Sequence, residues 1–249
     1  METLTSRKNA NIRRFRRLAD DAAYRREQGL YLCDGLKTLR EALAFGAKVV
    51  SVLWRGEALQ LDGLSDCEQF VAPEDLFDYA SPLKNSPGPL FSVAIRGCGK
   101  PGRLMNAIVL ESVQDPGNVG TVIRTANAFR IGAVILTGDC ADVYHPRTVR
   151  ATMGAIFRQN VLVMDKSSLK GFLKESGLPL YGAALSERAK DLRGLSLRHA
   201  AVAIGSEGRG LSEELLALCD EELIIPMNPD SESLNAAVAA AVLMWEMAR

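Results

Sequence analysis

The sequence predicts an α/β protein with a small amino-terminal domain and a larger carboxyl-terminal domain built on a parallel sheet. Short apolar, β-rich runs recur through the second half of the chain, with helical segments between them. They lie at residues 107–113, 133–138, 160–165, 179–185, 199–205 and 221–227. Runs that are apolar on both faces and alternate with helices are typical of a parallel sheet covered by helices on both faces. Ligands of such sheets bind at the carboxyl ends of the strands.

The first hundred residues also alternate between strand and helix patterns. Residues 29–57 predict a short strand, a helix with Leu36, Leu39 and Leu43 on one face, and a second strand at 49–54. The alternation continues to a strand that ends near residue 95. Glycines and a proline in residues 96–104 then break any regular element. We therefore expect one α/β domain at 1–97 and a second at 103–249.

Composition narrows the class of protein. The chain has 249 residues, of which 47% are hydrophobic and 24% charged, as in an ordinary soluble globular protein. The formal net charge is zero, so total charge does not indicate a partner. Five cysteines stand singly and there are only two histidines, which disfavours a zinc site, any other metal site and a disulfide framework. No apolar signal core or membrane-length run is present, so we expect a cytoplasmic protein without a membrane partner.

Basic residues gather at the amino terminus. The stretch 5–17 contains no acid, and its cations are Arg7, Lys8, Arg13, Arg14, Arg16 and Arg17. Such a cluster can hold a nucleic-acid backbone through its phosphates. It can equally be the solvated face of a helix, and the cluster alone favours neither interpretation.

The loop after the first strand of the second domain is unusually polar. In "DPGNVGTVIRTANAF", residues 115–129, Gly120 allows close backbone approach and the apolar residues recur at helical spacing. Arg124 falls opposite that apolar face, so burial against the sheet does not explain it. The alternative is an ordinary solvated arginine. The loop lacks the glycine pattern of a dinucleotide-binding fold and the lysine of a P-loop, so it gives little support to phosphate binding.

Two later strand ends carry further polar loops. The stretch "AIGSEGRGLS", residues 203–212, has three glycines that expose its backbone and one carboxylate, Glu207, whose ordinary role would be to cap a helix beginning near Leu211. The last loop leads into a carboxyl-terminal helix, with Ser233 and Asn235 at its first turn. Capping explains one of these two residues well, but not obviously both. The apolar stripe by which this helix is expected to pack is Leu234, Val238, Val242 and Trp245.

Together, the three loops resemble the signature motifs of the SpoU/TrmH branch of the SPOUT superfamily of RNA methyltransferases. The first motif, Asp-Pro-x-Asn-x-Gly-x-x-x-Arg-x-Ala, is matched by Asp115, Pro116, Asn118, Gly120, Arg124 and Ala126. The second, Gly-x-Glu-x-x-Gly-Leu, is matched by Gly205, Glu207, Gly210 and Leu211. The third, Ile-Pro-Met followed by Ser-Leu-Asn, is matched by Ile225, Pro226, Met227, Ser233, Leu234 and Asn235. Three motifs in register across residues 110–249 make the resemblance specific.

Two further parts of the chain resemble this family less strictly. The stretch "HPRTVRATMGAIFR" is similar to a family segment through Arg150, Gly154 and Ala155. The first hundred residues resemble the family's small substrate-binding domain, which has a ribosomal-protein-like RNA-binding fold. The chain departs from the family pattern at Pro229, where glycine is common, and after Asn235, where two alanines replace a Val-Ser pair.

The resemblance implies a fold, a cofactor and a reaction. It implies a parallel sheet with a deep trefoil knot, S-adenosylmethionine bound in the knot, and a homodimer whose site takes residues from both subunits. The implied reaction transfers the sulfonium methyl to a ribose 2′-hydroxyl of RNA, although the spacing of the motifs alone does not exclude a ring nitrogen as acceptor. With its separate amino-terminal domain, the chain is expected to act on ribosomal RNA rather than tRNA. A non-catalytic RNA-binding protein of this fold is the alternative from another class.

The resemblance also assigns residues. It implies a catalytic set of Arg124, Asn118, Glu207, Ser233 and Asn235, and a cofactor-binding set of Gly205, Ile225, Met227 and Leu234. We expect Arg124 to clamp an RNA phosphate and stabilise the developing alkoxide, because a guanidinium is a poor general base. The amino-terminal cations, from Arg7 to Arg17, are then expected to contact RNA phosphates.

Overall fold

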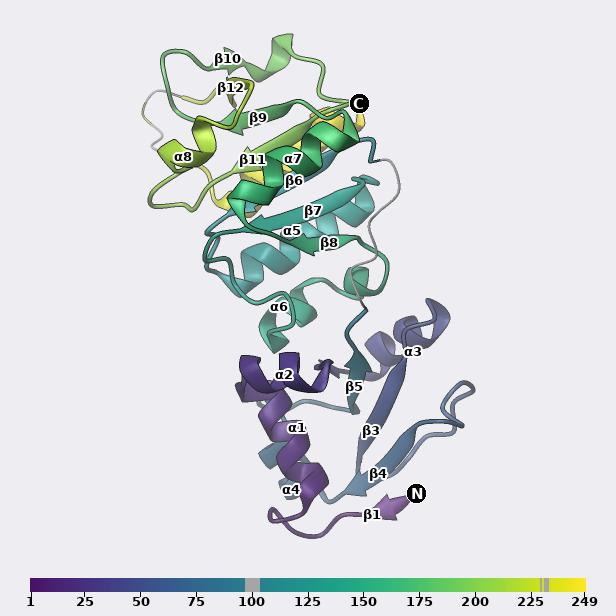
Figure 1. The fold of residues 1–249 in the computed structure, drawn as a ribbon. Coiled ribbons are helices and arrows are strands. Elements are labelled where there is room, and N and C mark those ends of the chain that lie inside the picture. The colour runs from purple at the N-terminus through teal and green to yellow at the C-terminus, as the bar shows by residue number, and fades with distance from the viewer. Residues whose placement is uncertain (97–103, 229, 231–232) are drawn as a thin grey trace. The chain divides into compact units, whose positions relative to one another are not determined.

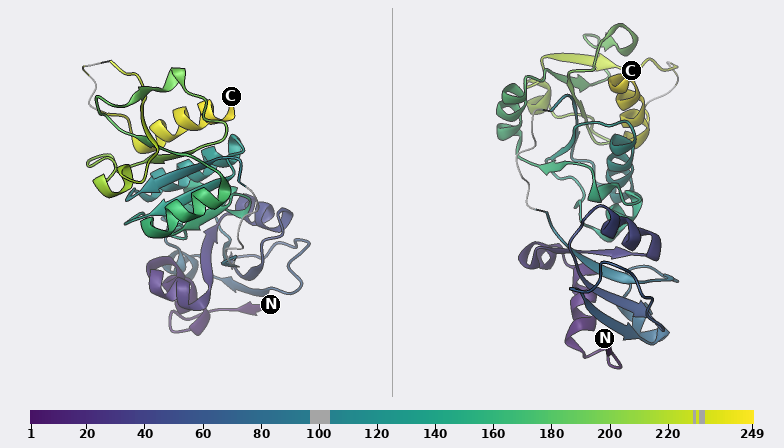
Figure 2. Two further views of the ribbon diagram at one scale, coloured as in Figure 1. Left: turned by 45° about the horizontal axis from the view of Figure 1, so that its top comes forward. Right: turned by 90° about the vertical axis from the view of Figure 1, so that its right-hand side faces the viewer.

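The computed structural model describes residues 1–96, 104–228, 230 and 233–249. Residues 97–103, where the sequence predicts the domain boundary, lie outside the described residues. The chain divides into two compact units, drawn in Figures 1 and 2. The first unit comprises 1–97 and 142–157, and the second comprises 98–141 and 158–249. No helix among the described residues is long and apolar enough to cross a membrane.

The first unit is built on a five-stranded mixed sheet in the order β1-β4-β3-β5-β2. The strands are β1 (Glu2–Thr3), β2 (Leu30–Asp34), β3 (Val49–Arg55), β4 (Glu68–Ala72) and β5 (Leu90–Ala94). The helices before residue 97 are α1 (Ala10–Asp20), α2 (Ala22–Gln28), α3 (Leu36–Ala44) and α4 (Glu74–Ala80). The strand, helix and strand predicted within 29–57 are confirmed as β2, α3 and β3.

Two apolar cores lie on opposite sides of this first sheet. On one side Phe15 and Leu18 of α1 pack with Phe77 of α4. On the other side Leu39 of α3 packs with Trp54 and Phe91 of the sheet. Because α1 turns one apolar face inward, its arginines lie on the side away from that core.

The segment Asp142–Phe157 corrects the predicted domain division, which placed all residues from 103 onward in one domain. The segment carries α6 (Pro146–Ala151) and a short 3₁₀ turn, η1 (Ala155–Phe157), and both cluster with the first unit. The physical reason is burial, because Val149 and Phe157 belong to the same apolar core as α3 and Trp54. The substrate-binding role of the first unit and the methyl-transfer role of the second stay predictions.

The second unit holds a seven-stranded sheet in the order β10-β12-β9-β11-β6-β7-β8, and all of its strand pairings are parallel. The strands are β6 (Ala107–Glu111), β7 (Ala133–Thr137), β8 (Val161–Val163), β9 (Leu180–Ala183), β10 (Lys190–Asp191), β11 (Ala201–Ile204) and β12 (Glu221–Ile224). The predicted parallel sheet is therefore confirmed. Each of the apolar runs read from the sequence contains one of these strands.

Helices cover both faces of the second sheet. They are α5 (Pro116–Ala128), α7 (Lys166–Ser176), α8 (Glu213–Leu216) and α9 (Ala236–Ala248), and a 3₁₀ turn, η2, spans Leu192–Gly194. Helices α5 and α9 lie side by side on one face, and α7 lies on the other (Figures 1 and 2). Asp115 caps the start of helix α5, because its carboxylate accepts a hydrogen bond from the backbone N–H of Asn118 at 2.8 Å.

The predicted packing face of α9 is wrong. Val238, Val242 and Trp245 are exposed by 50%, 36% and 57%. The buried residues of the helix are Ala236, Ala237, Ala240, Leu243, Met244 and Met247. Three alanines at the start of α9 allow close approach to the body, and Leu243, Met244 and Met247 fill the core further along the same face.

A buried ion pair ties the end of β6 to the loop that follows β11. The Glu111 carboxylate accepts hydrogen bonds from Ser212 N at 2.7 Å and Ser212 Oγ at 2.6 Å. It also pairs with Lys166 Nζ at 2.8 Å, although its side chain is only 4% exposed. Burial raises the pKa of Glu111, but the hydrogen bonds from Lys166 and Ser212 outweigh it, so the pKa lies below the ordinary value.

We expect Glu111→Gln to lower the free energy of unfolding by about 1.5–3 kcal/mol, the usual contribution of hydrogen bonds to a charged group. The native pKa is depressed, so this stabilisation is fully present above about pH 4.5 and disappears as the pH falls through the native pKa. Denaturant unfolding of both proteins between neutral and acid pH measures it. A difference between the proteins that stays constant into acid would contradict this account.

Candidate active site

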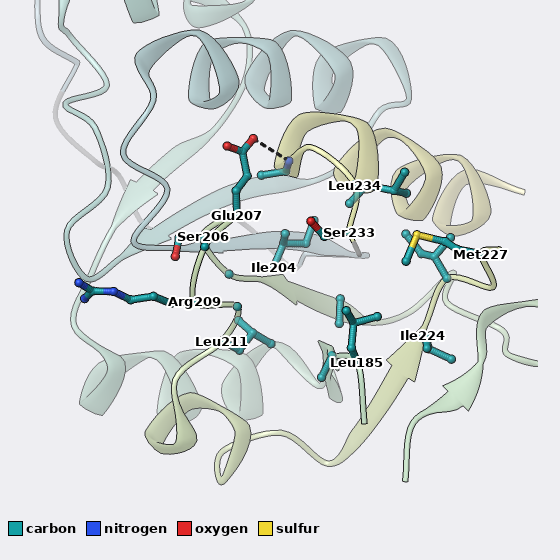
Figure 3. A pocket seen from close by; sticks show the side chains of 18 of the residues that line it. Leu185, Ile204, Ser206, Glu207, Arg209, Leu211, Ile224, Met227, Ser233 and Leu234 are labelled. Atoms are coloured by element: carbon teal, nitrogen blue, oxygen red, sulfur yellow. Dashed lines mark hydrogen bonds between the residues drawn. The ribbon is translucent and has the colours of Figure 1, made fainter. Parts of the chain in front are cut away.

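A pocket of about 500 Å³ lies at the carboxyl ends of β9, β11 and β12, the sheet edge at which the sequence predicts a ligand. Its walls are mainly apolar, as Figure 3 shows, with Leu185 and Ile224 on one side and Ile204 and Leu234 on another. Glu207 and Arg209 are the charged side chains in its lining. The volume is within the usual range for a small-molecule site.

The loop after β11 is folded back on itself by glycines. Gly210 has a φ of +64°, and its N–H donates to the Ser206 carbonyl at 2.8 Å. A Cβ atom at Gly205 would lie 1.9 Å from the carbonyl carbon of Gly210, so any side chain at 205 would force the loop open. The glycines therefore fix the backbone that lines the pocket, as the exposed-backbone interpretation of this loop predicts.

The Glu207 carboxylate joins the three motif loops. One of its oxygens, Oε1, accepts hydrogen bonds from Asn118 Nδ2 at 2.8 Å, from Asn235 Nδ2 and from Ala236 N at 3.2 Å. Asn235 Nδ2 also donates to Asn118 Oδ1 at 3.2 Å. In Figure 3 the carboxylate turns toward the start of α9, on the side away from Arg209.

The ordinary role considered for Glu207, capping the helix near Leu211, is wrong. That helix is α8, and its cap is Ser212, whose hydroxyl accepts from Leu215 N at 3.2 Å. Glu207 instead lies at the start of α9, where its charge complements the helix dipole.

The two polar residues before α9 have different roles. Asn235 is the cap, because its Oδ1 accepts from Ala237 N at 3.0 Å and from Val238 N at 3.3 Å. Ser233 does not cap the helix and lines the pocket instead. This agrees with the expectation that capping explains only one of them. Pro229, where the chain departs from the family pattern, lies outside the described residues.

Arg124 stands apart from this cluster. It is exposed on α5, opposite the buried face formed by Val119, Val122, Ile123 and Ala126. It does not line the pocket, and it makes no hydrogen bond or ion pair with any residue that the structure describes. The predicted orientation is therefore confirmed, and its role stays a proposal.

All four residues assigned to the cofactor, Gly205, Ile225, Met227 and Leu234, line the pocket. Sequence reasoning missed the wall formed by residues 183–185 after β9. The signal was available, because the run 179–185 is one of the parallel strands and its carboxyl end meets the same sheet edge. A search for buried apolar residues would not have found Leu185, however, because it is 64% exposed even though it lines the pocket.

The residues present fit S-adenosylmethionine. The apolar walls suit a purine ring, and the folded-back glycine loop offers backbone groups where a side chain at 205 would intrude. Glu207 contributes the carboxylate of the lining, which is compatible with a cationic sulfonium. Among the described residues, no group of three or more His, Cys, Asp or Glu side chains could hold a metal ion.

The amino-terminal cations lie in the first unit, on α1 and the residues before it. Several are engaged within the unit: Arg14 pairs with Glu68 at 2.6 Å, Arg16 with Asp20 at 2.7 Å, and Arg17 with Asp21 at 3.5 Å. Arg13 donates to the Lys8 carbonyl. Arg7 lies over the ring of Tyr79, 4.7 Å from its centroid. Lys8 makes no side-chain hydrogen bond or ion pair within the described part of the chain.

The chain is similar in sequence and fold to known proteins. The pattern of the SpoU rRNA Methylase family matches residues 105–245. The 23S rRNA (guanosine(2553)-2′-O)-methyltransferase RlmP of Bacillus subtilis is 29% identical over 99% of this chain and 99% of its own. A solved structure from Porphyromonas gingivalis, of a protein assigned to the TrmH family, is 32% identical with a TM-score of 0.84, over 96% of this chain and 97% of that one.

A third relative supports the fold alone. The structure of an AdoMet-bound rRNA methyltransferase from Sinorhizobium meliloti is 24% identical, has a TM-score of 0.89, and covers 98% of this chain and 96% of its own. The family pattern spans all three motif loops and more than half of the sequence. The chain therefore belongs to the SpoU rRNA methylase family.

Proposed function

We propose that this protein transfers the methyl group of S-adenosylmethionine to a ribose 2′-hydroxyl of ribosomal RNA. The observation that carries the proposal is the Glu207 carboxylate, which joins Asn118 and Asn235 beside the pocket. Ribosomal RNA is favoured over tRNA because RlmP acts on 23S rRNA and aligns with the chain from end to end. A non-catalytic RNA-binding role would leave this polar cluster beside a cofactor pocket without a purpose.

The cofactor supplies an activated methyl group, so the protein must position the nucleophile and manage its proton. We assign Gly205, Ile225, Met227 and Leu234 to holding the cofactor, because all four line the pocket. Ser233, which is not used as a cap, is placed to hydrogen-bond a polar group in the pocket. Asn118, Glu207 and Asn235 hold the loops in register and are the candidate groups that orient the ribose.

Arg124 is proposed as the group that clamps an RNA phosphate and stabilises the developing alkoxide. A guanidinium keeps its proton at neutral pH, so it is a poor base but a good bidentate donor to oxyanions. Its exposure and its lack of partners among the described residues leave its donors available to a substrate.

We further propose that the protein is a homodimer joined through α5 and α9. Val238, Val242 and Trp245 form an exposed apolar stripe along α9, and Trp245 meets Phe129, which directly follows α5, with ring centroids 5.7 Å apart. A second copy of the chain is the occupant that fits, because the same stripe on both subunits can pack on itself. Arg124, on the neighbouring helix α5, could then serve the partner's site.

The trefoil knot is part of the same proposal. Strand β12 lies outside β9 in the sheet, yet the helix that follows it packs on α5 and β11. The chain must therefore return across the loop after β11, where Glu207 holds the start of α9. This path supports a knot. A cytoplasmic location is also proposed, in keeping with cysteines that are free throughout the described residues.

The amino-terminal cations Arg7, Lys8, Arg13, Arg14, Arg16 and Arg17 are proposed to add to RNA affinity. Exposed ion pairs are worth little, so RNA phosphates can compete with the acids that pair with them. Arg7, Lys8 and Arg13 have no acidic partner among the described residues, so these three give up no ion pair on binding RNA.

Arg124→Ala is expected to lower methyl transfer by about 100- to 1,000-fold, as for loss of one donor to a developing oxyanion. Affinity for S-adenosylmethionine should not change, because Arg124 does not line the pocket. Transfer of labelled methyl to separate pools of undermodified rRNA and tRNA measures the rate, the substrate class and, after digestion, the 2′-O-methylnucleoside. Arg193→Ala is the matched control, since Arg193 is 76% exposed and, among the described residues, pairs only with nearby Asp191. Near-normal turnover of Arg124→Lys would show that the fork geometry of arginine is irrelevant.

Gly205→Ala is expected to weaken binding of S-adenosylmethionine by about 10- to 100-fold, because the added methyl would overlap Gly210 and displace the loop. Calorimetric titration with the cofactor alone measures the affinity. Gly171→Ala is the control, since a Cβ atom there meets nothing within 4 Å and lies on helix α7. Equal affinity in both variants would rule out the glycine loop as the cofactor cradle.

Trp245→Glu is expected to give a monomer, because a charge would then lie within the apolar interface. Light scattering on a sizing column measures the mass. Val163→Glu is the control, since Val163 is 71% exposed on β8, the other end of the sheet from β10. A dimer that persists in Trp245→Glu would place the interface elsewhere.

A further inference from the structure

Helix α6 presents two arginines on one exposed face. Pro146, Thr148 and Val149 are buried, whereas Arg147 and Arg150 are exposed. Residues three apart on a helix are neighbours on its surface, so the two guanidinium groups lie on the same side. Neither side chain makes a hydrogen bond or an ion pair with any described residue.

The segment that carries α6 is firmly attached to the first unit. The Arg25 guanidinium, whose side chain is only 3% exposed, pairs with Asp142 at 2.6 Å and donates to the Leu18 carbonyl at 2.8 Å. At the other end of the segment, Arg96 donates to the Phe157 carbonyl at 2.9 Å. The backbone that carries the arginines of α6 is therefore anchored at both ends of the segment.

Gly154, one of the residues by which this segment resembles the family, has a structural role in the turn after α6. Gly154 has a φ of +82°, and a Cβ atom there would lie 1.9 Å from a carboxylate oxygen of Glu41 on α3. The positive φ favours glycine at this position, and any larger residue would also have to displace the end of the Glu41 side chain. Arg150 has no comparable packing role, because its side chain is exposed.

Two lysines are the chain neighbours of residues that line a small cavity beside α6. A small cavity of about 20 Å³ is lined by Thr38 of α3, Leu83 of the loop before β5, and Arg150. Lys37 and Lys84, the chain neighbours of Thr38 and Leu83, are exposed and unpaired within the described residues. We call Lys37, Lys84, Arg147 and Arg150 the basic rim.

One acid also lines this cavity. Asp34 accepts a hydrogen bond from Ser86 Oγ at 2.6 Å, and burial raises its pKa, an effect that Ser86 and Arg150 partly oppose. It forms no ion pair within 4.0 Å with a cation of the rim. The rim therefore keeps a net positive charge, whereas Arg14, Arg16 and Arg17 on α1 are each paired with an acid. Unpaired cations release the most counterions from a nucleic acid.

We propose that the basic rim is an RNA-binding surface of the first unit, contacting phosphates of the substrate. This inference rests on the proposed function, because it takes RNA to be the polyanion that the protein binds. It assigns a role to Arg147 and Arg150, which the methyl-transfer site does not use. It also makes the segment 142–157 part of the substrate-binding unit, although in sequence it lies between two strands of the other sheet.

The test compares the double variant Arg147→Gln/Arg150→Gln with wild type in binding a transcribed, unmodified 23S rRNA over a range of salt concentrations. Loss of two phosphate contacts should reduce the slope of log affinity against log salt by about 1.4–1.8. The control is Lys170→Gln/Lys174→Gln on α7, which removes the same charge from exposed positions outside both sites. The variant Arg7→Gln/Lys8→Gln measures the proposed contribution of the amino-terminal cations in the same assay. Thermal unfolding and affinity for S-adenosylmethionine should match wild type in every variant.

A slope reduced in the α6 variant and unchanged in the control supports the proposal. An unchanged slope, or an equal reduction in the control, overturns it even if wild type methylates RNA normally. Conversely, wild type that binds rRNA through the basic rim but transfers no methyl group would contradict the proposed function and still support the basic rim as an RNA-binding surface. Wild type that binds no RNA would overturn both.

Discussion

One carboxylate holds the three motif loops of this protein together. Glu207 Oε1 receives hydrogen bonds from the first turn of α5, from the cap of α9 and from the backbone N–H that begins α9. These groups come from positions 118, 207, 235 and 236, far apart along the chain. Without this acceptor the two asparagines would have no common partner, and the loops that line the pocket would lose their register.

A second anchor acts on the same loop from the other side. Glu111, at the end of β6, fixes Ser212 through both its N–H and its hydroxyl, while Gly205 fixes the start of the loop by tight backbone contact. The loop from 205 to 212 is thus held at its beginning, its middle and its end. A site that is rigid before the ligand arrives loses less free energy to ordering, which is the condition for accurate positioning of a nucleophile.

The first unit carries two groups of basic residues, one on α1 and one on α6. Its α1 arginines are largely satisfied by neighbouring acids, whereas α6, which reaches the unit from the middle of the other domain's sequence, carries arginines with no acidic partner among the described residues. Contacts with a polyanion are favoured where cations are not already neutralised. The pairing of charges in the folded chain, rather than their density in the sequence, therefore separates the two basic surfaces.

The sequence by itself determined the parallel sheet, six of its seven strands, the outward direction of Arg124 and three of the loops beside the pocket, whereas it missed β10 and the pocket wall at 183–185. These follow from local periodicity and from residue types that only certain turns accept. It misplaced the packing face of α9, because that helix is apolar on nearly every side and periodicity cannot choose among apolar faces. Close packing with the rest of the second unit decided that the buried face is the one with three alanines, Leu243, Met244 and Met247. Only the tertiary structure decided that Glu207 serves α9 rather than α8 and that residues 142–157 belong to the first unit, because both depend on contacts between segments that are distant in sequence.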